Sequence, residues 1–434
     1  MFEIGTLDQF ADITMGQSPK GTSVSNKGEI PLLNGPTEFG INHPTPVQFT
    51  NNPKRFAKKG DLLFCVRGST GRMNWADQDY AIGRGLAAIR PKDGSSSHFL
   101  RGSVQFFLKH LLSGATGSVF TSINKDQLHK MECYLPDENN LKKINQMLGN
   151  FSGKIELNLK MNETLEEIAK TLFKSWFIDF DPVKAKAEGR PSGLSKEISD
   201  LFPDSFEDSE LGEIPKGWKI KDIKDVCNTT DYVANGSFKT LKDNVKRVDS
   251  NVKDSAILVR VTDHNSNWNG EFKYIDESSY NFLKKSKLFP GDIVICNVAD
   301  VGKCFMVPDL GRKMSLGPNG ILCKDFKEFE TVSKEYFFYF INTPGTQNLL
   351  SSISSGSVQN KFNKTQFRSL QMLVPSKKLI QSFDEVCKNI IEMKDLKNKE
   401  NQILTDLRDT LLPKLISGEL RIPDVEKLVE EARV

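Results

Sequence analysis

The sequence lacks the hallmarks of membrane and secreted proteins. No apolar run approaches the roughly 18 residues of a membrane-spanning helix. The opening segment, "MFEIGTLDQF", has neither the basic part nor the apolar part of a signal peptide. Seven cysteines, an odd number, are scattered without any Cys-x-x-Cys pair, which favours reduced thiols over disulfides. We therefore expect a cytoplasmic protein with no membrane partner.

Catalytic motifs are also missing. The sequence has no Gly-x4-Gly-Lys-Ser/Thr phosphate loop and no Asn/Asp-Pro-Pro-Tyr segment of amino-methyltransferases, and its five histidines are isolated. One partial match exists: Asp309 after a proline, followed by Asp325-x-Lys327, has the residue types of a metal-dependent nuclease. We expect no catalytic residues, no metal site and no cofactor bound by this chain.

Composition and charge indicate a globular protein of more than one domain. The 434 residues suffice for two or three domains with proper cores. Apolar residues make up 38% of the chain and charged residues 26%, which fits a soluble globular protein rather than a disordered one. The net charge of +3 argues against a protein that grips DNA by its own charge alone.

The chain contains an internal repeat. The clearest pair is "NKDQLHKMECYLP" (124–136) and "NKTQFRSLQMLVP" (363–375), 239 residues apart. Upstream, the further pairs are "KGDLLFC" (59–65) with "PGDIVIC" (290–296), "GLAAIR" (85–90) with "GILCK" (320–324), "LDQFADIT" (7–14) with "IKDVCNTT" (223–230), and Gly117-Ser118-Val119 with Gly356-Ser357-Val358. Matches in several places favour two copies of one fold with different loops over chance.

Each copy has the same order of elements. Short strands rich in β-branched and aromatic residues come first, with Cys65 and Cys296 at equivalent core positions. A short helix follows near 98–112 or 334–343, and the Asn-Lys-x-Gln segment then leads to Pro136 or Pro375. After each proline the pattern becomes helical.

The first helical segment, from Asp137 to about Ile178, has a heptad seam. The seam comprises Ile144, Leu148, Phe151, Ile155, Asn158, Asn162, Leu165, Ala169, Leu172 and Trp176. About 40 residues of helix span roughly 60 Å, too long to be covered by one small domain. The expected partner is the other copy's helix, packed antiparallel.

The second helical segment, 377–416, has a less regular seam. Phe383, Cys387, Ile390, Leu404 and Leu411 fit it, whereas Lys394 and Arg408 also fall on it. A shifted stripe of Met393, Leu396, Ile403 and Leu407 is the alternative. Asn162 and Asn401 align by the repeat offset, and two interpretations stay open: they fix the register of the helices, or they are solvated.

Between the copies, 181–217 is rich in Pro, Gly, Ser and charged residues, which indicates a connector with a short amphipathic piece at "LSKEISDLF". The predicted divisions are a globular domain at 1–136, a helix at 137–180, the connector at 181–217, a second domain at 218–375, and a helix with a C-terminal tail at 376–434. The fold class is α+β (mixed α/β).

The sequence resembles the specificity subunits of type I restriction–modification enzymes. The resemblance lies in "LFKSWFIDFDPVKAKAEGRPSGLSKEISDLFPDSFEDSELGEIPKGW" (172–218), in the strand-turns "GDLLFCVRGSTGR" and "GDIVICNVADVGK", and in "LLPKLISGEL" (411–420). It implies a tandem pseudo-twofold repeat of two target-recognition domains separated by two long, antiparallel, coiled-coil-like helices.

The resemblance also implies partners. Double-stranded DNA would be read at two different half-sites about one helical turn apart. Two methyltransferase subunits would dock for adenine methylation, and restriction subunits would join the full complex. S-adenosylmethionine, ATP and Mg²⁺ are then expected in the partner subunits only.

Reading base edges needs forked donors and amides in exposed loops. In the first copy the candidates for DNA contacts are Asn34, Thr37, Arg67, Ser69, Thr70, Arg72 and Arg84. In the second copy they are Arg260, Thr262, His264, Asn265, Asn297, Lys303, Lys313 and Asn319. Arg260 aligns with Asn34 by an offset of 226 residues. Trp75 and Trp268 stand in loop regions, where stacking on DNA and packing at the surface are both open.

Three hypotheses follow for the function. The first is a DNA-recognition subunit without catalysis of its own, which directs methylation and restriction by its partners. The second is a scaffold whose two adaptor heads bind proteins. The third is a nuclease that uses Asp309 and Asp325.

Overall fold

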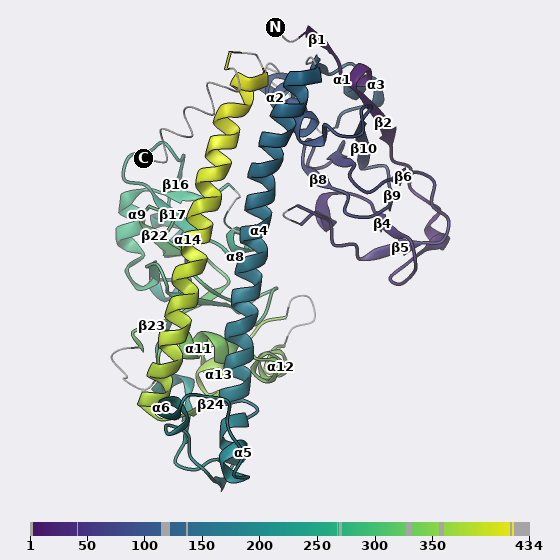
Figure 1. Ribbon diagram of the computed structural model, residues 1–434. Helices are drawn as coiled ribbons and strands as arrows, with labels where there is room; N and C mark the ends of the chain where they lie inside the picture. The colour runs from purple at the N-terminus through teal and green to yellow at the C-terminus, as the bar shows by residue number, and fades with distance from the viewer. Residues whose placement is uncertain are drawn as a thin grey trace. The chain divides into compact units, whose positions relative to one another are not determined.

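The computed structural model describes residues 3–40, 42–113, 122–135, 138–266, 268, 271–326, 332–355, 360–416 and 419–420. The chain divides into two compact units. Unit 1 combines residues 1–162 with 395–434, and unit 2 is the continuous stretch 163–394. Two long helices, α4 (Glu138–Phe177) and α14 (Lys377–Ile416), each contribute to both units (Figure 1).

Unit 1 contains three sheets, with helices between and after their strands. Its elements are β1 (Glu3–Thr6), α1 (Leu7–Phe10), β2 (Ala11–Met15), η1 (Gly21–Ser23), β3 (Val24–Ser25), β4 (Pro31–Leu33), η2 (Pro36–Glu38), β5 (Gln48–Thr50), β6 (Phe56–Ala57), β7 (Leu62–Cys65), β8 (Met73–Trp75), β9 (Tyr80–Ile82), β10 (Leu86–Pro91), α2 (Ser97–Ser113), α3 (Lys125–His129) and β11 (Glu132–Leu135). The sheet orders are β1-β11, β2-β10-β7-β8 and β3-β5-β4-β9-β6.

Unit 2 repeats these three sheets. Its elements are α5 (Asp181–Ala187), α6 (Lys196–Ser199), β12 (Phe206–Ser209), β13 (Gly212–Pro215), β14 (Lys219–Asp222), η3 (Ile223–Asp225), β15 (Asn228–Asp231), η4 (Tyr232–Asn235), α7 (Phe238–Asn244), β16 (Arg247–Val248), β17 (Ala256–Val259), α8 (Val261–Asn265), β18 (Tyr274–Ile275), α9 (Glu277–Phe282), η5 (Lys284–Ser286), β19 (Lys287–Leu288), β20 (Ile293–Cys296), β21 (Cys304–Met306), β22 (Met314–Leu316), β23 (Gly320–Lys324), α11 (Lys334–Ile341), α12 (Pro344–Ser352), α13 (Lys364–Arg368) and β24 (Gln371–Val374). The corresponding orders are β14-β24, β15-β23-β20-β21 and β16-β18-β17-β22-β19, beside the hairpin β12-β13.

The shared strand order confirms the tandem repeat and the α+β class. In each unit one strand pair of the five-stranded sheet is parallel, β4 with β9 and β17 with β22. Register corrects one predicted match. Leu86 pairs with Cys65, and Gly320 pairs with Cys296, so Gly320 corresponds to Leu86 and not to Gly85. The position equivalent to Gly85 is Asn319, because both carbonyls accept from the residue after the paired cysteine.

The repeated Asn-Lys-x-Gln phrase is a helix cap. Asn124 Oδ1 accepts the Gln127 N–H at 2.9 Å, and Gln127 Oε1 accepts the Asn124 N–H at 3.0 Å. Asn363 and Gln366 make the same reciprocal pair at 2.9 and 3.1 Å. These capping boxes satisfy N–H groups at the starts of α3 and α13, which leave no partner inside the helix. Pro136 and Asp137, the predicted boundary, lie outside the described residues, and α14 begins two residues after Pro375.

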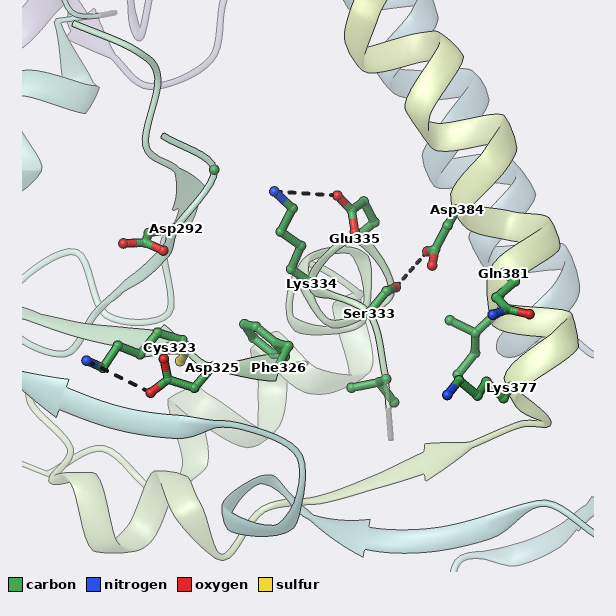
Figure 2. A pocket seen from close by; sticks show the side chains of 14 residues that line it. Asp292, Cys323, Asp325, Phe326, Ser333, Lys334, Glu335, Lys377, Gln381 and Asp384 are labelled. Atoms are coloured by element: carbon green, nitrogen blue, oxygen red, sulfur yellow. Dashed lines mark hydrogen bonds and ion pairs between the residues drawn. The ribbon is translucent and has the colours of Figure 1, made fainter. Parts of the chain in front are cut away.

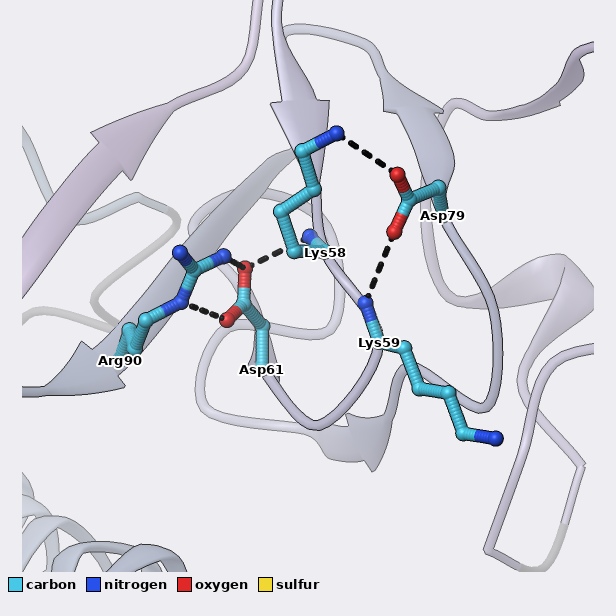
Figure 3. Close-up of polar contacts among 5 residues, drawn as sticks. All are labelled: Lys58, Lys59, Asp61, Asp79 and Arg90. Atoms are coloured by element: carbon cyan, nitrogen blue, oxygen red, sulfur yellow. Dashed lines mark hydrogen bonds and ion pairs between the residues drawn. The ribbon is translucent and has the colours of Figure 1, made fainter. Parts of the chain in front are cut away.

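A second repeated device is the turn before the buried strand. In unit 1, Asp61 Oδ2 accepts the Lys58 N–H at 2.8 Å, and both carboxylate oxygens accept from Arg90 at 2.6 and 2.9 Å (Figure 3). In unit 2, Asp292 Oδ2 accepts the Phe289 N–H at 2.8 Å. Lys324 occupies the Arg90 position by register but, among the described residues, pairs with Asp325 and not with Asp292.

The cores lie between the sheets and the long helices. In unit 1, Ile144 and Leu148 of α4 pack with Leu411, Leu412 and Leu415 of α14. In unit 2, Phe173, Trp176 and Phe177 of α4 join Tyr336 and Phe383, with ring centroids 4.9–6.2 Å apart. The second half of α4 is therefore part of a domain core, beyond the helix-to-helix seam that the sequence predicts. Cys65 and Cys296 are buried, as expected, and burial raises the pKa of each thiol to about 12.

The predicted seam is confirmed at most positions, and the shifted stripe in α14 is wrong. Met393, Leu396, Ile403 and Leu407 are 43–65% exposed. Polar side chains lie in the seam instead. In unit 2, Lys394 Nζ lies 2.6 Å from Glu166 Oε2, with both side chains less than 30% exposed.

The seam asparagines form hydrogen bonds between the two helices. Asn158 is fully buried, and its Nδ2 donates to Asn401 Oδ1 at 2.9 Å and to Glu400 Oε2 at 3.0 Å. Asn162 Nδ2 donates to Asn398 Oδ1 at 2.8 Å. In unit 1 these bonds run across an antiparallel helix pair, because a later residue of α4 meets an earlier residue of α14. They favour the interpretation that the asparagines fix the register.

The predicted connector is folded onto unit 2. Helix α5 and the β12–β13 hairpin contribute Val183 and Ile214 as buried residues, and Phe202 packs against Trp176 with ring centroids 5.4 Å apart. No helix in the described part of the chain combines the length and apolarity needed to cross a membrane.

Candidate nucleic-acid interface

Three loops of unit 1 meet at one edge of its sheets. They follow β4, β7 and β9, and we call residues 34–38, 66–72 and 83–85 the first loop edge. The Val66 N–H donates to the Gly85 carbonyl at 2.9 Å, and the Gly83 N–H donates to the Leu33 carbonyl at 2.8 Å. Gly68 and Gly71 have φ of +79° and +89°, a conformation that suits glycine in the tight turn after β7. These bonds bring the predicted candidates of the first copy to one surface.

The candidates on the first loop edge have different tasks. Arg72 donates to the carbonyls of Pro36 and Phe39 at 3.3 and 3.0 Å, so it joins two of the loops. Asn34 Nδ2 donates to Gln48 Oε1 at 2.8 Å. Arg67 and Arg84 are exposed, and their guanidinium groups have no acceptor among the described residues. Thr37 and Ser69 are exposed, and Thr70 is half-buried.

Unit 2 builds an equivalent edge from different residues. We call this surface the second loop edge. It comprises residues 260–266, 268, 297–303 and 317–319, together with Asn360 and Lys361. The Gly317 N–H donates to the Val259 carbonyl at 2.8 Å, as Gly83 does to Leu33 in unit 1. Arg260 therefore occupies the position of Asn34, as the sequence predicts.

Arg260 is braced by a buried carboxylate. Its guanidinium donates to Asp263, which is 2% exposed, and to the Glu271 carbonyl at 3.0 Å. The Arg260 side chain remains 31% exposed, so the bidentate pair holds it at the surface in one orientation. These bonds use the Nε and Nη2 donors, so the Nη1 group, with its two N–H donors, is the part of Arg260 suited to a guanine or phosphate oxygen.

A polar network links two loops of the second loop edge. Lys303 Nζ donates to Asn265 Oδ1, and Asn265 Nδ2 donates to Asp300 Oδ2 at 2.7 Å. Lys303 and Asn265 are exposed, whereas Asn297 is half-buried and donates to the Phe362 carbonyl at 3.3 Å. Thr262 is exposed, and Asn319 is exposed with φ of +74°.

His264 is an aromatic element of this edge. Its ring stacks on Phe305 with centroids 4.4 Å apart and an interplanar angle of 13°, and Trp268 packs edge-on against Phe305. Burial, and then the nearby charge of Lys303, lower the pKa of His264 to about 4. The imidazole is therefore neutral at pH 7 and adds no charge. Trp268 belongs to this packed cluster, which favours the packing interpretation for that residue.

Lys313 is not brought together with the other candidates. It precedes β22, whereas the second loop edge follows the other end of that strand. Its Nζ lies 3.0 Å from Glu277 Oε1 and 5.9 Å from the centre of the Tyr280 ring.

Lys361 is a surface cation that the sequence reasoning missed. It is exposed and forms a β-bridge with Val298, and the Ala299 N–H donates to the Asn360 carbonyl at 3.2 Å. In unit 1 the equivalent bridge joins Arg67 to Ser122. One cation is present at this bridge in both units, but on opposite strands. The 239-residue offset that aligns the capping boxes also aligns Ser122 with Lys361. This alignment could have identified Lys361 from the sequence.

The described residues hold no group of three or more His, Cys, Asp or Glu side chains that could bind a metal ion. Of the partial nuclease motif, Lys327 lies outside the described residues. Asp309 Oδ1 accepts the Gly311 N–H at 2.8 Å, and Asp325 accepts from Asn228 Nδ2 at 3.1 Å. Both carboxylates thus have ordinary structural partners.

A cavity of about 820 Å³ in unit 2 lies at the other end of β20 from the second loop edge (Figure 2). Ser333, Lys334, Glu335 and Asp384 line it, and Ser333 Oγ donates to Asp384 Oδ1 at 2.6 Å. Burial, together with the charge of Glu335, raises the pKa of Asp384 to about 7 although the bond from Ser333 lowers it. Asn145 occupies the matching helix position in unit 1 and caps α2 through the His98 and Phe99 N–H groups.

The chain is similar to known proteins over most of its length. Residues 1–167 match the family model of the type I restriction modification DNA specificity domain. The type I restriction enzyme HindI specificity subunit of Haemophilus influenzae is 26% identical over 426 residues, covering 85% of this chain and 88% of that protein. The MjaIX specificity subunit of Methanocaldococcus jannaschii is 25% identical over 389 residues, covering 86% and 80%.

Solved structures show a weaker likeness. The S subunit of a type I restriction–modification system from M. genitalium has a TM-score of 0.46 at 15% identity, covering 96% of both chains. The HsdS subunit from Thermoanaerobacter tengcongensis has a TM-score of 0.33. At these TM-scores the likeness supports no inference about function. The family model over residues 1–167 and the curated relatives confirm the resemblance of this chain to type I restriction–modification specificity subunits that was seen in the sequence.

Proposed function

We propose that this chain is the DNA-recognition subunit of a type I restriction–modification complex and reads an asymmetric, bipartite target. The observation that carries the proposal is the pair of loop edges. The same strand framework presents exposed cations and amides in both units, yet the side chains at equivalent positions differ. Different donors read different base edges, so the two half-sites should differ in sequence.

The loop edges supply both kinds of contact that duplex recognition needs. Arg67, Arg84, Lys303 and Lys361 are exposed cations suited to phosphates or guanine. Arg260, held by Asp263, is the best candidate for a base contact, because its guanidinium is already oriented. Lys313 is left out of the proposed interface, since Glu277 engages it at the opposite end of β22.

The proposed partners follow from the family and from the charge. A net charge of +3 is small for a protein that would hold a duplex alone. Two methyltransferase subunits would complete the clamp, bind S-adenosylmethionine and methylate adenine at N6. Restriction subunits would add ATP- and Mg²⁺-dependent cleavage, and this chain would carry out no chemistry itself.

Methylome sequencing of cells that contain this chain and its methyltransferase tests the proposal. We expect one methylated motif with two unlike half-sites and a fixed spacer. Exchanging residues 1–136 for those of a relative should change one half-site only. Lengthening α4 and α14 by one turn each should change the spacer, and an unchanged spacer would contradict the role of the helices as a ruler.

Charge variants of the complex test the loop edges. We expect Arg67→Ala or Lys303→Ala to weaken duplex binding and to lower the salt dependence by about one phosphate contact. Lys27→Ala and Lys313→Ala are matched controls, because each removes one positive charge at the opposite end of β4 or β22. Equal effects of test and control variants would refute these edges as the interface. No duplex binding with the methyltransferase present would favour a protein scaffold instead.

A further inference from the structure

Unit 1 contains a cavity of about 490 Å³ that the recognition of DNA bases does not use. Its walls come from the turn before β7, from Trp75 of β8, from α2, and from the two long helices, with Arg101 and Arg408 among the lining residues. Gly60 and Trp75 lie at the start of β7, because Leu62 pairs with Trp75. The first loop edge lies at the other end of the same strand. The cavity is therefore separate from the proposed base-reading surface.

Arg101 is the unusual group in this cavity. Its guanidinium lies over the Trp75 ring, 5.5 Å from the centroid, and protein atoms surround it on most sides. Within the part of the chain that the structure describes, it has no hydrogen-bond acceptor and no carboxylate in ion-pair range. Burial lowers the pKa of Arg101 to about 10, so the side chain is still charged at pH 7. A partly buried charge without a partner is unfavourable, and a bound anion would relieve it.

A second cation lines the same space. Arg408 of α14 is 23% exposed in its side chain, and its charge contributes to the lowered pKa of Arg101. It lies 2.9 Å from Asp409, so its charge is partly matched. Two guanidinium groups from different helices form a pair of forks suited to the oxygen atoms of one phosphate.

The acidic residues of the wall do not neutralise Arg101. Glu156 lies 2.8 Å from Lys160 and 4.0 Å from His43. Asp77 Oδ1 accepts the Tyr80 hydroxyl at 2.6 Å. Both carboxylates thus have other partners, and the guanidinium of Arg101 remains available to a ligand.

The cavity also has room and an aromatic surface. A side chain at Gly153 would meet no atom within 4 Å, so this part of α4 leaves open space. Trp75 and His98 lie edge to face with ring centroids 5.5 Å apart. The volume exceeds that of a phosphate ion alone, and the aromatic side chains could contact a base.

We propose that this cavity binds the phosphate group of a nucleotide through Arg101 and Arg408, with the base against Trp75 and His98. The nucleotide is either a free small molecule or part of a nucleic acid outside the target bases. The inference does not depend on the proposed function, because it uses neither loop edge.

Binding measurements on the full chain, alone and with its methyltransferase, test the site. The probes are inorganic phosphate, adenosine monophosphate and a short duplex, at matched ionic strength with chloride as the reference anion. We expect saturable binding that Arg101→Gln weakens by about tenfold to a hundredfold, the range for losing one charge-assisted contact. Adenosine monophosphate binding more tightly than phosphate indicates a free nucleotide, whereas competition by the duplex alone indicates a nucleic-acid phosphate; both support the site.

Two further variants keep the test independent of folding defects. Gly153→Leu fills the cavity without touching either arginine and should block binding. Arg101→Met should raise the unfolding temperature of the anion-free protein, because it removes a partly buried, unpaired charge. Binding that is unchanged in both Arg101→Gln and Gly153→Leu would overturn the proposal. The proposal would also be overturned if phosphate and adenosine monophosphate bound no more tightly than chloride. It would be overturned as well if the methyltransferase subunit covered the cavity and excluded every probe.

Discussion

The repeat offers a controlled comparison of one carboxylate position in two settings. Asp61 and Asp292 occupy the same turn and accept the same kind of backbone bond at 2.8 Å. Only Asp61 is paired with an arginine, in a bidentate arrangement, and its side chain is 4% exposed. Replacing each aspartate by asparagine keeps the shape and an acceptor for the backbone N–H while removing the charge.

Asp61→Asn and Asp292→Asn should change the folding stability in opposite directions or by very different amounts. Breaking a buried ion pair by removing one partner costs about 3–5 kcal/mol, and the half-exposed Arg90 reduces this to about 2 kcal/mol. Pairing with Asp61 raises the pKa of Arg90, which shows that the arginine shares the stabilisation. Asp292 is the opposite case, because burial raises the pKa of its carboxyl group.

A carboxyl group with a raised folded-state pKa stabilises the fold in its neutral form, below the unfolded pKa. That contribution is lost as the pH rises through the folded pKa. The setting of Asp292 therefore contributes less to the stability of unit 2 as the pH rises. We expect Asp292→Asn to change the stability of unit 2 by between zero and a gain of about 1 kcal/mol, since a neutral amide needs less solvation.

Hydrogen–deuterium exchange of peptides from β7 and β20 measures the opening of each turn separately, which whole-chain unfolding of two units does not. Asp61→Asn should speed exchange around β7, whereas Asp292→Asn should leave β20 unchanged or slower. If both variants lose the same stability, or if Asp61→Asn loses less than about 0.5 kcal/mol, the assignment of the stabilisation to Arg90 is wrong.

Three further predictions concern other sites. Asp384, with a pKa of about 7, should make unit 2 less stable as the pH rises from about 4 to about 7; Asp384→Asn should flatten this dependence in urea titrations and add about 1–2 kcal/mol at pH 8, and an unchanged pH profile would count against it. Asn158→Leu should raise the thermal midpoint, because it replaces a buried amide whose Oδ1 has no partner among the described residues; Asn162→Leu, whose Oδ1 likewise has no partner there but whose side chain is less buried, should act in the same direction by a smaller amount, and a fall of several degrees would reverse this interpretation. Gly71→Ala should destabilise unit 1 by about 1 kcal/mol or more, since φ is +89° and the added Cβ would lie 2.3 Å from Leu108; Gly153→Ala is the control in open space, and equal thermal midpoints for the two variants would contradict the strain.

Most of the fold could be predicted from the hydrophobic periodicity and the internal repeat of the sequence. The sequence alone indicated both long helices, and α4 and α14 begin within a residue or two of the predicted starts. Heptad spacing identified Ile144, Leu148 and Phe383 as buried because such spacing places residues on one helix face. The alternative stripe failed because polar residues can occupy a seam when a partner is present, as Lys394 shows with Glu166.

The surface was harder to predict, since loop side chains carry no periodic signal. The repeat placed Arg260 opposite Asn34 correctly, but a glycine at each of positions 85 and 320 suggested a match one residue out of register. A turn does not require glycine, and the residue at the position equivalent to Gly85 is Asn319. Lys361 was overlooked because the residue that matches it in unit 1 is Ser122, whereas the cation of that bridge in unit 1 is Arg67 on the opposite strand.

The division of the chain has a consequence for synthesis on the ribosome. Unit 2 is one continuous stretch, 163–394, whereas unit 1 is completed only by residues beyond 394. A growing chain therefore has every residue of the second unit before the first unit can close its helix pair. Until then, Ile144 and Leu148 lack Leu411 and Leu415, the residues that cover them in the finished protein. The first unit to be translated is thus the last to be finished, and its exposed apolar stripe is a natural binding site for a chaperone during that interval.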